Sequence, residues 1–118
     1  MSDTNNSNIK AAYQDKVNNL SMLEQNLQQM LVQRQNFQTQ IIEIESAISE
    51  MKNTDIQYKI VGSIMIKSDK ESLQSELSKK KEILELRIST IKKQEDKIRE
   101  KAKSLQQDIM SDVEKEGN

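Results

Sequence analysis

The sequence predicts a mainly α fold, a long antiparallel coiled-coil helical hairpin with a β-hairpin at its centre. Apolar residues recur at heptad spacing in both halves, a short β-branched segment surrounds Gly62, and proline is absent. Because proline breaks helices and glycine weakens them, long helices are possible on both sides of Gly62. Only 34% of the 118 residues are hydrophobic, too few for a round globule with a sizeable core.

The first half of the chain carries a coiled-coil seam. Alternating steps of three and four residues from Tyr13 to Met51 visit twelve positions, and ten of them hold apolar or aromatic residues. Ile9 extends the series towards the N-terminus. Such regularity is typical of a helix that buries one stripe against a partner, not of a disordered chain. We therefore expect a helix over residues 9–53, preceded by a polar, disordered tail over residues 1–8.

The second half repeats the pattern. From Leu77 to Ile109, eight of ten seam positions are apolar. A helix over residues 69–113 is predicted, followed by a disordered tail over residues 114–118. Each arm of about 45 residues would be roughly 65 Å long at the α-helical rise per residue. Two such arms joined by a short connection are expected to pair antiparallel as one domain over residues 9–113.

The start of the second helix carries a capping signal. Ser68 and Glu71 have the spacing of a capping box, and Asp69 is placed to favour the positive end of the helix dipole.

Two charged residues, Arg34 and Glu95, interrupt the seam. In one antiparallel register they fall in adjacent layers, opposite Ile91 and Met30 respectively. Two interpretations remain open. The side chains reach the edge of the seam and keep their charges in water, or they form a buried pair that fixes the register at some cost in stability.

Residues 57–67 are predicted to form a β-hairpin. Gln57–Val61 and Ile64–Lys67 are rich in β-branched residues, and Gly62-Ser63 between them has glycine first, as a type II′ turn requires. Pairing around this turn places apolar side chains on both faces, whereas a soluble hairpin normally has one polar face. An isolated two-stranded hairpin is also marginally stable.

The hairpin therefore needs partners. The simplest partners are similar hairpins of other subunits, which would close a sheet or a β-barrel platform. In the alternative, the hairpin folds back onto its own helices, which covers one face only. The residues expected to mediate oligomerisation are Tyr58, Ile60, Val61, Gly62, Ile64, Met65 and Ile66.

Composition argues against several classes of function. Cysteine and histidine are absent, which excludes zinc fingers, haem sites and Ser-His or Cys-His nucleophiles. No glycine-rich phosphate loop occurs, so we expect no catalytic residue, cofactor or metal. The net charge of -1 gives no general attraction to nucleic acid or membrane. The polar N-terminus lacks the apolar core of a signal peptide, which favours a cytoplasmic location.

The hairpin and the helix after it carry a family resemblance. Tyr58-Lys-Ile-Val-Gly-Ser-Ile-Met-Ile-Lys67 combines aromatic-Lys-x-x-Gly with three apolar residues and a lysine, and Leu84-Glu-Leu-Arg-Ile88 and Lys92-Lys-Gln-Glu-Asp-Lys97 continue the match. The sequence thus resembles the prefoldin family, particularly the archaeal β-type subunits, over about residues 9–113. A single hairpin favours the β-type over the α-type, although Ser63 stands where asparagine is more common.

The resemblance implies a function and a set of partners. Prefoldins are ATP-independent chaperones, hexamers of two α-type and four β-type subunits whose hairpins form a double β-barrel platform. The tips of their coiled coils hold unfolded proteins and pass them to a group II chaperonin. The implied partners of this chain are an α-type subunit, unfolded client proteins and a group II chaperonin, with no nucleic acid and no membrane.

If the hairpin forms the platform, the free tips consist of the two chain ends. Lys16, Asp108 and Asp112 interrupt the apolar surface there, so the seam is expected to close less firmly and the terminal turns to fray. Either these ends hold clients, or their apolar residues are ordinary seam and flank residues. The candidate client-binding residues are Ile9, Tyr13, Val17, Leu20, Leu105, Ile109, Met110 and Val113.

A function of a different class also fits a helical pair with an oligomerising centre. The chain would then be a structural scaffold or tether subunit that binds native partners. Binding of unfolded rather than native proteins distinguishes the two functions.

Overall fold

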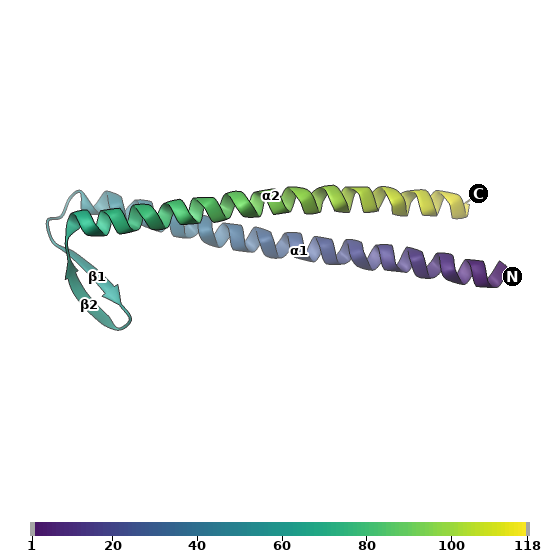
Figure 1. The fold of residues 1–118 in the computed structure, drawn as a ribbon, viewed down its shortest axis with the longest axis horizontal. Helices are drawn as coiled ribbons and strands as arrows, with labels where there is room; N and C mark the ends of the chain where they lie inside the picture. The colour runs from purple at the N-terminus through teal and green to yellow at the C-terminus, as the bar shows by residue number, and fades with distance from the viewer. Residues whose placement is uncertain (1, 118) are drawn as a thin grey trace. The chain divides into compact units, whose positions relative to one another are not determined.

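The structure is a computed structural model that describes the backbone of residues 2–117 and the side chains of residues 8–115. The elements follow in the order α1 (Ser2–Met51), β1 (Gln57–Val61), β2 (Ile64–Ser68) and α2 (Lys70–Gly117), as Figure 1 shows. The prediction of a mainly α chain with a central antiparallel hairpin is confirmed.

The chain divides into two compact units, and each is described by itself. The hairpin unit comprises Gln33–Ile91, which includes both strands. The terminal unit comprises the residues up to Val32 and those from Lys92 onwards. Each unit therefore contains one part of α1 and one part of α2.

The helices extend further at the chain ends than the sequence predicts. Disordered tails are expected over residues 1–8 and 114–118, whereas α1 begins at Ser2 and α2 ends at Gly117. The first and last residues of the chain lie outside the described residues. The prediction fails because the polar tail residues are only mediocre helix formers and include no proline. A helix that is already nucleated can continue through them.

The C-terminal end of α1 tightens into a turn. The helix ends at Met51 rather than at the predicted residue 53. The backbone N–H of Lys52 then donates to the Ser49 carbonyl at 3.3 Å, and that of Asn53 to the Glu50 carbonyl at 3.1 Å. These hydrogen bonds to the residue three positions earlier satisfy carbonyl groups that the helix end would otherwise leave unpaired.

The predicted seam is confirmed position by position. All twelve positions from Tyr13 to Met51, and all ten from Leu77 to Ile109, are buried or half-buried. Burial is uneven, however. Among the described side chains, the terminal unit buries one apolar residue, Ala102, whereas the hairpin unit buries five. Those five are Ile44, Met51, Leu84, Ile88 and Ile91.

The two strands pair as predicted. Val61 lies opposite Ile64 at the turn, and the pairing runs back to Gln57 opposite Ser68. The second strand is therefore one residue longer than the predicted Ile64–Lys67. The register places successive side chains of each strand on opposite faces of the sheet.

The turn depends on Gly62. Among the described residues it alone has a positive φ, 62°, in the left-handed region that side chains with a Cβ rarely adopt. A type I′ turn would also require a positive φ at Ser63, which Ser63 does not have. The backbone thus agrees with the predicted type II′ turn.

The N-cap of α2 is Asp69, not Ser68 as the predicted capping box requires. Oδ2 of Asp69 accepts a hydrogen bond from the Ser72 backbone N–H at 3.2 Å, and its carbonyl accepts from the Leu73 N–H at 2.9 Å. Ser68 is instead the last residue of β2, paired with Gln57. The longer strand thereby moves the cap one residue along the chain.

Asp69→Ala is expected to lower the free energy of unfolding by about 1 kcal/mol, the usual cost of losing an N-cap side chain. Ser68→Ala is the matched control and is expected to change stability much less. Urea unfolding followed by circular dichroism measures both. A larger loss for Ser68→Ala than for Asp69→Ala would restore the capping box read from the sequence.

Candidate functional site

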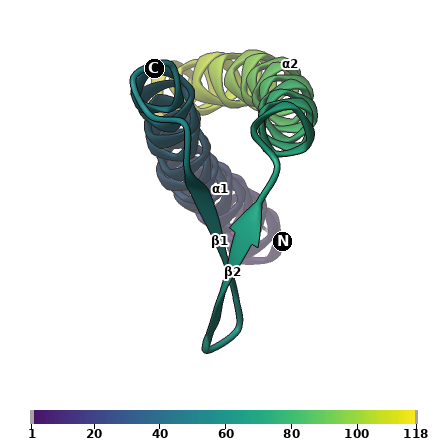
Figure 2. The same ribbon diagram turned by 90° about the vertical axis from the view of Figure 1, so that its left-hand side faces the viewer.

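The hairpin leaves its apolar side chains in solvent on both faces. Figure 2 shows it projecting away from the two helices of the hairpin unit. Gly62 at the turn is exposed as well. The alternative in which the chain's own helices cover one face of the hairpin is therefore wrong. The apolar members of the predicted set are 49–69% exposed, and they are Tyr58, Ile60, Val61, Ile64, Met65 and Ile66.

Two polar side chains fix the base of the hairpin. Gln57 is only 7% exposed, and its Nε2 donates to the carbonyl and to Oγ1 of Thr54, each at 2.9 Å. Nζ of Lys59 forms an ion pair with Oε1 of Glu76 on α2 at 2.6 Å. Neither role could be predicted from the sequence, because neither polar residue differs by type from an ordinary solvent-facing strand residue.

An open groove of about 410 Å³ lies beside the hairpin base. Side chains from α1, β1 and α2 line it, so the apolar surface of the hairpin continues onto the helices. The apolar residues among them are Ala47, Met51, Tyr58, Ile60, Leu73 and Leu77.

Charged side chains form contacts between the helices of the hairpin unit. Nζ of Lys81 lies 3.1 Å from Oε1 of Glu45 and 3.9 Å from Oε1 of Glu85. The hydrogen bond to Glu45 raises the pKa of Lys81, and the charges of both carboxylates act in the same direction. The guanidinium of Arg87 lies 5.8 Å from the centroid of the Phe37 ring, within the range of a cation–π contact.

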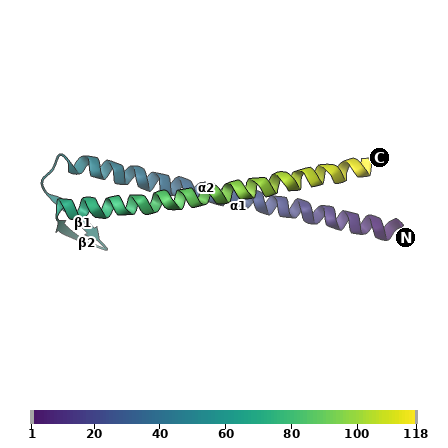
Figure 3. The same cartoon turned by 45° about the horizontal axis from the view of Figure 1, so that its top comes forward.

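The terminal unit holds the predicted client-binding residues. Figure 3 shows the two chain ends at the same end of this unit. Ile9, Met110 and Val113 are exposed, whereas the others are half-buried on the seam side. The half-buried residues are Tyr13, Val17, Leu20, Leu105 and Ile109. The client-binding role of this set stays a prediction.

A second groove lies between the helices of the terminal unit. It has a volume of about 450 Å³ and is lined by Met22, Leu23 and Leu105 among polar neighbours. Met22 is 60% exposed, as expected for a residue beside the seam. Its unbranched thioether side chain differs from those of its polar neighbours, because it can adapt to irregular apolar partners.

A lysine and an aspartate link the two helices of the terminal unit. Nζ of Lys16 donates to Oδ2 of Asp112 at 2.7 Å. This hydrogen bond raises the pKa of Lys16 above its usual value; the charges of Asp112 and Asp108 add to the effect, and partial desolvation opposes it. In the sequence these charges are recognisable only as interruptions of the seam. The structure pairs two of them instead.

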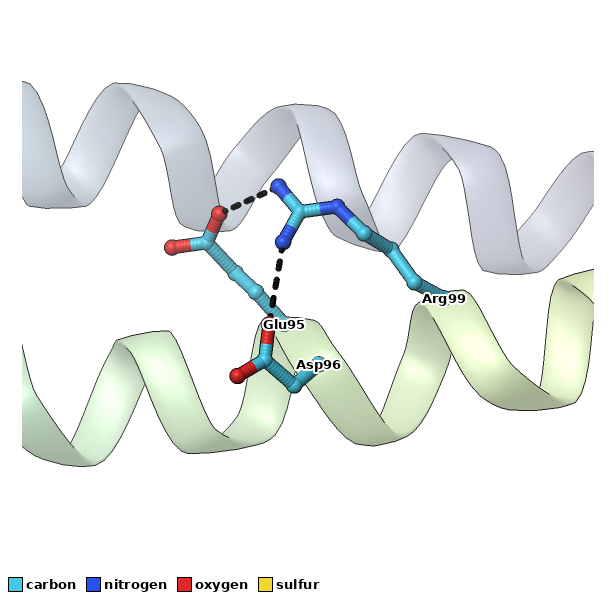
Figure 4. A network of polar contacts seen from close by, with 3 residues as sticks. All are labelled: Glu95, Asp96 and Arg99. Atoms are coloured by element: carbon cyan, nitrogen blue, oxygen red, sulfur yellow. Dashed lines mark hydrogen bonds and ion pairs between the residues drawn. The ribbon is translucent and has the colours of Figure 1, made fainter.

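A buried carboxylate lies in α2 within the terminal unit. Glu95 is 2% exposed, and its Oε2 accepts a hydrogen bond from Arg99 Nη2 at 3.1 Å. Nη1 of Arg99 also bonds to Oδ1 of Asp96 at 3.3 Å, as Figure 4 shows. The burial of Glu95 contradicts the interpretation in which its charge lies in water at the seam edge. Arg34 is half-buried.

The described part of the chain contains no cluster of three or more acidic residues that could hold a metal ion. Neither described helix has an apolar stretch sufficient to cross a membrane.

Exposed apolar side chains on a helical frame are typical of proteins that assemble with or bind other proteins. The profile of the family described as "Prefoldin subunit" matches residues 14–116. Prefoldin subunit beta of Archaeoglobus fulgidus is 37% identical over 101 residues, which cover 83% of this chain and 87% of that protein. Prefoldin subunit beta of Pyrococcus furiosus is 37% identical over 107 residues, covering 88% and 92%.

A solved structure gives the same result. The crystal structure of the prefoldin beta subunit from Thermococcus strain KS-1 matches with a TM-score of 0.77 and 33% identity, covering 85% of this chain and 90% of that one. The chain therefore belongs to the prefoldin family, among its β subunits, as the hairpin motif predicts. Its general role is that of a chaperone subunit, in a family of chaperones rather than enzymes.

Proposed function

We propose that this chain is a β-type subunit of a cytoplasmic, ATP-independent chaperone, and that its terminal unit holds unfolded proteins for delivery to a group II chaperonin. One observation carries the proposal: exposed apolar side chains cover both faces of the hairpin, and Ile9, Met110 and Val113 are also exposed near the chain ends. In this proposal the hairpin binds other subunits, and the chain ends bind unfolded client proteins.

The hairpin is the assembly surface in this proposal. Apolar side chains on both faces favour burial between hairpins of neighbouring subunits. An isolated two-stranded hairpin is marginally stable, and its open edges are free to pair with further strands. The polar contacts of Gln57 and Lys59 support this role, since they hold the hairpin base before any partner arrives. The partners would be an α-type subunit and further β-type copies, two α and four β in all.

The chain ends are the holding surface. Burial of apolar groups of an unfolded client would contribute about 25 cal/mol per Å², from which the cost of ordering the client is subtracted. Single contacts of this kind are weak and indifferent to sequence. Several arms that engage one client together would raise the overall affinity.

Substituting exposed apolar residues at the chain ends tests this function. Ile9→Ser with Met110→Ser is expected to weaken holding by about ten-fold, the loss expected from two partly buried side-chain contacts. Suppression of aggregation of a chemically unfolded test protein measures the effect, at matched oligomer concentration. Both residues are exposed, at 49% and 63%, so their replacement leaves the buried and half-buried seam side chains in place.

The matched control is Ile42→Ser with Leu86→Ser in the hairpin unit. These residues are 65% and 68% exposed, so the control removes as much exposed apolar surface elsewhere on the helices. It is expected to hold the test protein as the parent does. Equal losses in the two variants would contradict a specific role of the chain ends, and selective binding of native proteins would favour the scaffold function.

A further inference from the structure

A charged pair links the helices at a seam position that would ordinarily hold an apolar residue. Lys16 occupies the heptad step between Tyr13 and Leu20. Its ammonium lies 2.7 Å from Oδ2 of Asp112, a residue 96 positions away in the sequence. The side chains are only 33% and 26% exposed, so solvent screens this pair less than a fully exposed one.

The pair lies among the candidate holding residues. Tyr13 and Val17 flank Lys16 on α1, and Ile109 and Val113 flank Asp112 on α2, at spacings of three residues and one residue. Tyr13, Val17 and Ile109 are half-buried rather than exposed. Their exposure to a client therefore depends on how closely the two helices approach each other at this level.

Few of the described apolar side chains of this unit are fully buried. Ala102 is the one buried apolar residue among the described side chains of the terminal unit. Alanine buries little surface, so the remaining closure depends on half-buried residues and on the Lys16–Asp112 contact. A contact that contributes a modest free energy can decide an equilibrium that is otherwise near balance.

We propose that Lys16 and Asp112 form an ionic clasp that regulates access to the holding surface. When the clasp is closed, the helices stay together and cover part of Tyr13, Val17 and Ile109. When it opens, these side chains become available to an unfolded client. The inference rests on the proposed function of the chain ends and adds a means of regulating it.

Ionic strength is the natural signal for such a clasp. The screening length falls from about 8 Å at 0.15 M to about 3 Å at 1 M salt, so the ion pair weakens as salt rises. Apolar contacts are not screened in this way. An apolar residue in place of Lys16 would give a closure that salt does not open.

Four variants of the assembled protein test the clasp. Asp112→Asn removes one charge with almost no change in shape, and Lys16→Met fills the seam with an apolar side chain. Lys16→Glu combined with Asp112→Lys reverses the pair. The matched control is Glu45→Gln, which breaks the similar Lys81–Glu45 contact of 3.1 Å in the hairpin unit.

The first measurement is amide hydrogen exchange at residues 9–20 and 105–113. Asp112→Asn is expected to raise exchange there about two- to five-fold, the range of a weak cross-helix ion pair. Glu45→Gln is expected to leave the exchange of these segments unchanged. Lys16→Met is expected to make their exchange insensitive to salt, and the reversed pair is expected to restore the parental protection. Circular dichroism verifies that each variant retains its helix content.

The second measurement is suppression of aggregation of an unfolded test protein. The Asp112→Asn protein is expected to suppress aggregation at a concentration about two- to five-fold lower than the parent protein needs, the same factor as the rise in its exchange rate. Unchanged exchange in Asp112→Asn, or a reversed pair that exchanges like Asp112→Asn, would overturn the clasp. Raised exchange with unchanged holding would establish the clasp but overturn the holding function of these ends.

Discussion

Ile60→Asp is expected to dissociate the assembly into smaller species while helix content stays nearly unchanged. Ile60 is the fourth of the five residues of β1, opposite Met65, and it is among the most exposed apolar residues of the described chain. If assembly buries this position between hairpins, an unpaired carboxylate there costs several kcal/mol. Helix content depends on the seam, which the substitution does not touch. Sedimentation velocity and circular dichroism measure the two quantities.

Ile64→Asp extends the test to the opposite face, because Ile64 pairs with Val61 at the neighbouring step of the ladder. Dissociation by both substitutions means that assembly covers both faces, whereas dissociation by one of them means that a single face is covered. The control is Ile42→Asp, a similarly exposed isoleucine on α1 of the hairpin unit. Assembly of both hairpin variants at the parental mass would disprove the platform.

Removal of residues 1–19 and 106–118 is expected to abolish client holding without preventing assembly. The deletion takes away most of the candidate holding residues and leaves the hairpin unit intact. About 30 residues of each helix remain, well above the length at which isolated helices become marginal. The truncated protein is therefore expected to assemble and to lose protection of a chemically unfolded test protein.

The comparison requires matched concentrations of oligomer, because dissociation alone would also reduce the number of arms on each client. Light scattering during dilution of the test protein from denaturant measures protection. If the truncated assembly protects as well as the parent does, clients bind elsewhere, on the hairpin platform or along the remaining helix faces.

Much of the fold could be predicted because the informative signals are local and repeated. The heptad series from Tyr13 to Met51 spans many turns, so a few exceptions such as Arg34 do not obscure it. The turn signal at Gly62 is similarly clear, since a two-residue turn with glycine first leaves few alternative registers for the two strands beside it. The structure agrees with both.

Two of the failures have different physical causes, one in competition between a local signal and its surroundings and the other in helix alignment. The capping pattern at Ser68 is real, but pairing with Gln57 holds Ser68 in the sheet and moves the cap to Asp69. The contact between Lys16 and Asp112 joins residues from opposite ends of the sequence. Their approach depends on how the two helices are aligned, which residue types alone do not specify.

The uneven burial of apolar side chains gives the chain a graded response to warming. Five apolar side chains are fully buried in the hairpin unit, whereas among the described side chains of the terminal unit one alanine is, and its other apolar seam residues are half-buried. Local opening requires the least free energy where the fewest apolar contacts are lost, so the helix ends would melt at temperatures at which the hairpin unit is still folded. In a holding protein, heat that unfolds clients would then also uncover the side chains that receive them, without dismantling the subunit.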